Sequence, residues 1–154
     1  MKLQAHEEKH YNIIRKLAPE CMVLLKSNGD FPLKEPQKVD LYGNGARRTI
    51  KGGTGSGDVN VRHFSTIEEG LINAGFKIGT TDWLDNYDAI WEEAHNEFCN
   101  NLKNKIDKEG FSAFMQGLGA VMPEPEYDIP IIGNADTAIY VLGRVSGEGS
   151  DREV

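Results

Sequence analysis

Short apolar segments alternate with amphipathic helical patterns along this chain, and that alternation constrains its fold more than any other feature. Strands are predicted over residues 38–43, 76–78 and 137–142, with helices over 66–75 and from Asp82 onward. Strands that are separated by helices favour a parallel sheet with right-handed crossovers. We therefore predict an α/β fold that is built on a parallel sheet.

Capping residues and hydrophobic spacing locate the ends of the two central helices. Ser65 and Glu68 form a capping-box pattern, and Gly75 ends the helix that follows. Asp82 is the predicted N-cap of the long helix. Its apolar positions recur at helical spacing, and they are Leu84, Tyr87, Trp91, Ala94, Phe98 and Leu102. We interpret Trp83 and Trp91 as core or interface aromatics.

Outside these segments the pattern is less decisive. A helix is predicted over about 6–16, and a short one over 111–118. The apolar run Met22–Leu25 fits either a helix or a strand, and both interpretations stay open. The stretch 123–130 contains three prolines and is predicted to be an extended surface loop.

Composition and charge exclude several classes of function. The 154 residues suffice for one domain with a sizeable core, and a net charge of −7 disfavours nucleic acid or an anionic membrane as partner. Cys21 and Cys99 have no metal or redox spacing, which predicts reduced thiols in a cytoplasmic protein. Residues 1–10 lack a signal-peptide pattern, and no apolar run has the length of a membrane span. The histidines show no metal-ligand pairing, so we predict neither a metal nor a cofactor.

A glycine-rich segment, 43–58, directly follows the first predicted strand and carries Arg47 and Arg48. It does not fit a nucleotide-binding loop, because a dinucleotide motif needs glycine where Arg48 stands and no phosphate-binding Gly-Lys-Ser/Thr is present. Glycines allow a ligand to approach the backbone closely, with arginine side chains nearby. A flexible surface loop explains the segment equally well, and both interpretations stay open.

Glu148 lies in a second glycine-containing loop, 143–152, after the last predicted strand. The carboxyl ends of parallel strands share one edge of a sheet, where ligands bind, so this loop and the segment 43–58 are expected on the same edge. A carboxyl group at that place suits acid/base chemistry, although a solvated glutamate paired with Arg144 or Arg152 is the simpler alternative. Because no partner carboxylate is visible, the pattern suggests half of an active site.

Taken together, these segments resemble the α/β-sandwich domain of family-three glycoside hydrolases, the β-glucosidase group. The residues that carry the resemblance are 10–26, 31–33, 39–58, 66–76 and 135–152. The resemblance implies a three-layer α/β sandwich that is incomplete relative to the full domain, with residues 1–154 as a single partial domain. It also implies a catalytic TIM barrel outside this chain, in a parent protein with reversed domain order of which this chain is an N-terminal fragment.

The resemblance assigns chemistry to named residues. Glu148 corresponds to the general acid/base of a retaining β-glycosidase, and Asp151 and Arg152 shape its loop. Ser56, Gly57 and Asp58 border the sugar pocket.

The same resemblance implies partners and a state for the isolated chain. The expected partners are a β-glucoside or oligosaccharide substrate and the protein's own barrel, which supplies the nucleophilic aspartate, so the chain alone should be inactive. An uncovered sheet edge leaves room for a homo-oligomer. The alternative is a non-catalytic carbohydrate-binding or interaction module of α/β fold.

Overall fold

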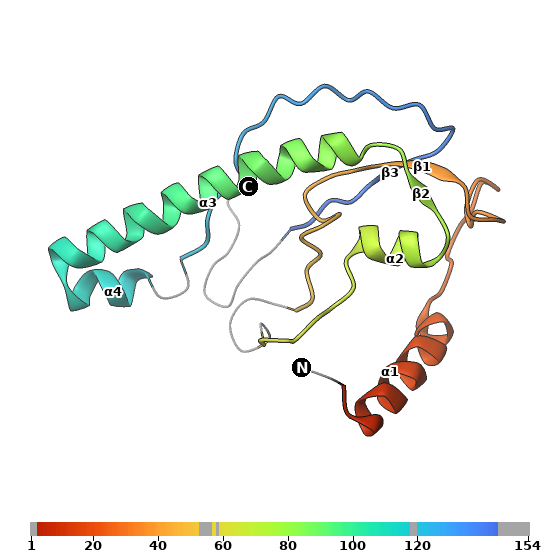
Figure 1. Ribbon diagram of the computed structural model, residues 1–154, viewed down its shortest axis with the longest axis horizontal. Helices are drawn as coiled ribbons and strands as arrows, with labels where there is room; N and C mark the ends of the chain where they lie inside the picture. The colour runs from red at the N-terminus through yellow and green to blue at the C-terminus, as the bar shows by residue number, and fades with distance from the viewer. Residues whose placement is uncertain (1–2, 53–56, 58, 118–119, 145–154) are drawn as a thin grey trace. The chain divides into compact units, whose positions relative to one another are not determined.

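Strand β1 (Lys38–Tyr42) is the centre of a three-stranded sheet with the order β2-β1-β3. Both neighbours, β2 (Lys77–Ile78) and β3 (Ala138–Tyr140), run parallel to β1 (Figure 1). This arrangement confirms the predicted parallel α/β sheet. The strands that were predicted over 76–78 and 137–142 are longer than the segments that pair.

The computed structural model describes residues 3–52, 57, 59–117 and 120–144. It divides into two units, Met1–Glu35 and Pro36–Val154. In the first unit, α1 (Ala5–Leu17) is followed by the short 3-10 helix η1 (Ala18–Cys21), and neither helix has a buried residue. The run Met22–Leu25, which fits both helix and strand in the sequence, has no regular secondary structure. The assignment of residues 1–154 to a single domain stays a prediction.

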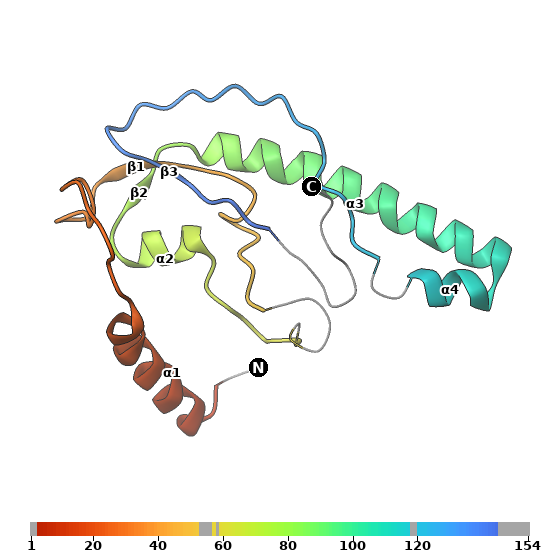
Figure 2. The ribbon, with the colours of Figure 1, turned by 180° about the vertical axis from the view of Figure 1, so that it is seen from behind.

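The core of the second unit forms around β1. In the view of Figure 1, α2 (Ile67–Asn73) lies below the strands, and α3 (Thr81–Glu109) begins beside them and extends away to the left; Figure 2 shows both helices from behind. Six buried side chains form the central cluster: Leu41, Tyr42, Ala46, Trp83, Leu84 and Tyr87. Trp83 is 5% exposed and packs edge-on against Tyr42, which confirms its predicted place in the core.

The start of α3 is hydrogen-bonded to β1 through the side chain of Thr80. The Thr80 hydroxyl accepts a hydrogen bond from Leu41 N at 2.8 Å and donates one to Leu41 O at 2.7 Å. Thr80 is the N-cap residue, and Asp82 lies in the first turn, so the prediction of Asp82 as N-cap was wrong. A carboxylate in the first turn still interacts favourably with the helix dipole.

The cap of α2 is displaced by one residue from its predicted position. The Thr66 hydroxyl accepts a hydrogen bond from Glu69 N at 3.1 Å, and Glu69 Oε2 accepts one from Thr66 N at 3.3 Å. This is a complete capping box. The predicted pair, Ser65 and Glu68, has the same spacing, but it does not form the cap.

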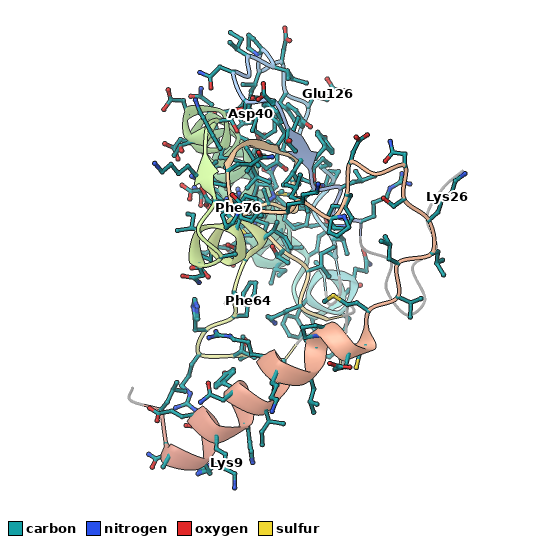
Figure 3. The ribbon with its side chains drawn as sticks, turned by 90° about the vertical axis from the view of Figure 1, so that its right-hand side faces the viewer. Lys9, Lys26, Asp40, Phe64, Phe76 and Glu126 are labelled. Atoms are coloured by element: carbon teal, nitrogen blue, oxygen red, sulfur yellow. The ribbon has the colours of Figure 1, made fainter. Side chains whose placement is uncertain are left out.

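After α4 (Phe111–Gly117), the chain returns to the sheet as an extended segment that arches over α3 (Figure 1). Several residues of this segment are half-buried, among them Tyr127 and Ile129, which pack on the central cluster. The prediction of an extended loop is confirmed, although one side of the loop is packed against the core. Near its end, Ala135 N donates a hydrogen bond to the carboxylate of Asp40, a buried residue that is labelled in Figure 3.

In the part of the chain that the structure describes, no helix combines the length and the apolar character that crossing a bilayer requires.

Gly43 lies where the backbone that leaves β1 comes very close to the backbone that leaves β3. Its φ angle is +97°, and an added Cβ would lie 2.3 Å from the Val141 carbonyl oxygen. We expect Gly43→Ala to lower the free energy of unfolding by about 2–4 kcal/mol, because both the backbone conformation and the space exclude a side chain. In urea unfolding, the matched variant Gly70→Ala should stabilise the protein by about 0.5–1 kcal/mol, since its Cβ meets open space within α2. Equal stability of the two variants would mean that the contact at Gly43 does not limit the size of its side chain.

The hydroxyl groups of Tyr127 and Tyr140 lie 3.1 Å apart, and this hydrogen bond together with burial raises the pKa of Tyr127 from 10.0 to about 12. A raised folded-state pKa stabilises the fold below the unfolded pKa, and that contribution is lost as the pH rises through the folded pKa. The stability difference between wild type and Tyr127→Phe should therefore shrink as the pH increases from about 10 to about 12. Urea unfolding at about pH 9, 10 and 11 measures this difference, and a constant value would count against the tyrosine pair as its source.

Candidate functional site

The loops that leave the carboxyl ends of β1 and β3 are joined at their stems. Gly45 N donates a hydrogen bond to Val141 O at 3.1 Å. Asn44 then pairs with Gly143 through its side chain: Oδ1 accepts from Gly143 N at 2.6 Å, and Nδ2 donates to Gly143 O at 2.9 Å. The described stems of both loops thus lie on one edge of the sheet, as the sequence predicts.

Most of the predicted site residues lie outside the described residues. These are Ser56, Asp58, Glu148, Asp151 and Arg152. Gly57 is described and exposed, and a Cβ added to it would meet nothing within 4 Å. The roles that the resemblance assigns to these residues therefore stay predictions.

Arg47 connects the base of the glycine-rich segment to both α2 and α3. Its Nε and Nη2 donate to the two carboxylate oxygens of Glu68 on α2, at 2.6 and 3.0 Å. Its Nη1 donates to Asp85 at 2.6 Å and to Asp88 at 2.9 Å on α3. The hydrogen bonds to Glu68 are the largest cause of the raised pKa of Arg47, so its guanidinium stays charged.

Arg48 forms a second connection to α3. Its Nη1 donates to Asp88, and its guanidinium carbon lies 4.1 Å from the centre of the Trp91 ring. A cation over an aromatic face is attracted by the ring quadrupole. Trp91 also stacks with His95, one turn further along α3, and the two ring centres are 4.7 Å apart.

These contacts give Arg47 and Arg48 partners within the protein. The sequence leaves open whether arginines beside the glycine-rich segment bind a ligand, but the structure pairs both with acidic residues of α2 and α3. The signal was present in the sequence, because Asp85 and Asp88 are three residues apart and so share one face of α3.

A cavity of about 710 Å³ opens beside these stems. It is lined by Asn44, Arg48, Ile50, Tyr87, Trp91, residues 121–124 and residues 142–144. Glu124 is fixed at its wall, because it accepts one hydrogen bond from the Tyr87 hydroxyl and another from Asn44 Nδ2 at 3.3 Å. Burial, followed by the hydrogen bond to Glu124, raises the pKa of Tyr87, so the phenol remains a donor.

Sequence reasoning missed Glu124, which lies in the proline-containing stretch and matches no motif. Its partner Asn44 is 80 residues away, so no local spacing could reveal the pair. As for metals, the described ranges contain no group of three or more His, Cys, Asp or Glu side chains that is arranged to hold an ion.

We expect Arg47→Lys to destabilise the protein by about 1–3 kcal/mol, because lysine keeps the charge but cannot make the paired hydrogen bonds to Glu68. The matched variant Arg144→Lys should change stability by less than about 0.5 kcal/mol, since Arg144 is exposed and forms no ion pair with another described residue. Urea unfolding at low and high salt measures both effects. Identical curves for the two variants would show that Arg47 is not a structural connection.

Comparison with known proteins assigns this arrangement to a family. Residues 22–154 match the family model described as the glycosyl hydrolase family 3 C-terminal domain. Two curated relatives are β-glucosidase A of Butyrivibrio fibrisolvens, 32% identical over 96% of this chain, and a β-glucosidase of Ruminococcus albus, 31% identical over 86%. The chain spans 16% and 13% of the lengths of these two proteins.

Solved structures of β-glucosidase 3B from Thermotoga neapolitana resemble the fold. One, in complex with α-D-glucose, has a TM-score of 0.56 at 28% identity and covers 95% of this chain and 19% of its own. Another, in complex with glucose, has a TM-score of 0.58 at 27% identity, with 97% and 20% covered. With a family match over 22–154 and these relatives in agreement, the chain belongs to glycosyl hydrolase family 3 and forms part of the C-terminal α/β domain of that family.

Proposed function

We propose that the chain carries the general acid/base of a retaining β-glycosidase that hydrolyses terminal β-D-glucosyl residues. Its family and the β-glucosidases among its relatives support this reaction. The observation that carries the proposal is the pairing of Asn44 with Gly143. It joins the stems of the two loops to which the resemblance assigns the sugar pocket and the acid/base.

In the proposed reaction, Glu148 donates its proton to the glycosidic oxygen while an aspartate attacks the anomeric carbon. The leaving alcohol departs, and a glycosyl ester forms on the aspartate. Glu148 then removes a proton from water, whose oxygen displaces the aspartate and releases the sugar with its configuration retained. In retaining enzymes the two carboxyl groups are about 5 Å apart.

The nucleophile is proposed to come from a TIM-barrel domain outside this chain. Residues 1–154 alone would then bind part of the substrate without turning it over. In the same proposal, Asp151 and Arg152 shape the loop of Glu148, and Ser56, Gly57 and Asp58 border the sugar pocket. The reaction requires no metal or organic cofactor.

The proposal is tested in the full-length protein with Glu148→Ala. Turnover of an aryl β-glucoside should fall by about 10²–10⁴-fold, since general acid/base groups contribute that much. Added azide should restore the rate, because it attacks the glycosyl ester without needing a base. The control Glu97→Ala, on an exposed part of α3, should keep wild-type activity.

Two results would each overturn one part of the proposal, the first the role of Glu148 and the second the place of the nucleophile outside this chain. One is full activity of Glu148→Ala in the full-length protein. The other is turnover by the isolated chain, since that would place both carboxyl groups within residues 1–154.

A non-catalytic carbohydrate-binding module is the second candidate, and the cavity favours it. Its volume of about 710 Å³ is in the range of small-molecule sites, and Trp91 and Glu124 provide an aromatic ring and a carboxylate at its wall. Titration of glucose or cellobiose into the isolated chain, with Trp91→Ala as the comparison, measures this binding. Full-length protein that binds sugar and shows no hydrolysis would favour the module over the enzyme.

A further inference from the structure

The ladder between β1 and β3 continues beyond the end of β1 by means of a side chain. Tyr42 pairs with Tyr140 in register, and Val141 N donates to Tyr42 O at 2.8 Å. In a regular parallel ladder, the next bonds would join the backbone of Asn44 to Val141 O and to Gly143 N. Those bonds are not made by the Asn44 backbone, because the chain turns at Gly43, whose φ angle is +97°.

Two substitutes complete the ladder. Gly45 N takes the place of Asn44 N and donates to Val141 O at 3.1 Å. The side-chain oxygen of Asn44 takes the place of its carbonyl and accepts from Gly143 N at 2.6 Å. The Asn44 amide nitrogen adds a bond of its own to Gly143 O, at 2.9 Å. The backbone that follows β3 is therefore held at Gly143 by an amide side chain, on both its donor and its acceptor.

The orientation of that amide is fixed by its surroundings. Asn44 Nδ2 faces two acceptors, Gly143 O and Glu124 Oε2, while Oδ1 faces the Gly143 N–H donor. If the amide were flipped, its oxygen would face two acceptor oxygens and its NH₂ group would face the Gly143 N–H, so none of the three hydrogen bonds could form. Glu124 in turn accepts a hydrogen bond from the hydroxyl of Tyr87, a buried residue of α3. The orientation of the Asn44 amide is therefore supported by a residue of the core.

We propose that Asn44 is a positioning residue for the general acid/base. Gly143 precedes Glu148 by five positions in the sequence, so the contacts with Asn44 hold the chain shortly before the Glu148 segment. Displacing a catalytic group by about 1 Å can cost about 10²-fold in rate. This inference rests on the proposed function, and it adds a residue that does not itself touch the substrate.

The kinetic test uses the full-length protein with Asn44→Asp, which keeps the size of the side chain and loses the donor to both Gly143 O and Glu124 Oε2. We expect kcat to fall about tenfold or more for glucosides with poor leaving groups, which need the proton. Dinitrophenol leaves readily without protonation, so for dinitrophenyl glucoside the loss of kcat in the step that releases the phenol should be several-fold smaller than for the poor leaving groups. The inhibition constant for glucose should stay within about threefold of the wild-type value. The matched control Asn96→Asp, exposed on α3, should behave as wild type throughout.

A second measurement uses the 154-residue chain and needs no activity. Amide hydrogen exchange at Gly143 should be about tenfold faster or more in Asn44→Ala than in wild type. Exchange at Gly79, whose N–H donates to Val39 O of β1 at 2.8 Å, should be unchanged. Glu124→Ala should give a smaller acceleration, because it removes one of the three contacts of the amide.

The possible outcomes separate this inference from the function on which it rests. Exchange at Gly143 that is unaffected by Asn44→Ala overturns the positioning role, as does an equal loss of kcat for good and poor leaving groups. An inactive wild-type full-length protein, or a fully active Glu148→Ala variant, overturns the proposed function instead. Altered exchange together with leaving-group-dependent loss supports both.

Discussion

Strand β1 makes contacts along both of its edges and on its faces, and the second unit depends on these contacts. Its edges pair with β2 and β3, while Val39 and Leu41 are fully buried and Tyr42 contacts Trp83 of α3. The Thr80 hydroxyl adds hydrogen bonds to both backbone groups of Leu41. Because a buried backbone group without a partner is costly, this strand fixes where α3 begins and how β3 approaches.

At the carboxyl edge of the sheet, two features determine how the chain leaves β1: glycines that allow a close backbone approach, and ion pairs with the helices. Gly43 and Gly45 allow the backbone to meet Val141 closely, and Arg47 then reaches the acidic residues of α2 and α3. The glycine-rich segment therefore leaves the sheet from a base that is connected to both helices. If the catalytic groups come from more than one domain, as we propose, such a base gives a loop a defined starting point.

The sequence predicted those features of the fold that depend on local patterns. Hydrophobic spacing and capping residues located β1, α2 and α3, and the parallel sheet followed from their order. The cap of α2 was misplaced because local chemistry allowed two solutions: Ser65 and Thr66 are both good caps, and each has a glutamate three residues later. Thr80 was missed because its hydroxyl bonds to Leu41, which is a tertiary contact.

The candidate site was less predictable for the same reason. The sequence placed Arg47 and Arg48 in the glycine-rich segment but did not indicate that they would pair with Asp85 and Asp88. Glu124 gave no signal, since its contacts form only after an extended segment has packed over α3. Glu148 was identified from its glycine neighbours and from resemblance, and it lies outside the described residues, so its assignment stays a proposal.

The two tryptophans have quite different environments, and this has a practical consequence. Trp83 is enclosed by Tyr42, Tyr87 and Tyr127 in the aromatic core, whereas Trp91 is covered by the Arg48 guanidinium and stacked on His95. Nearby charge and exposure change indole emission in ways that enclosure by other rings does not. Single-tryptophan versions of the protein would thus report two separate events by fluorescence: loss of the core for Trp83, and release of the cavity wall for Trp91.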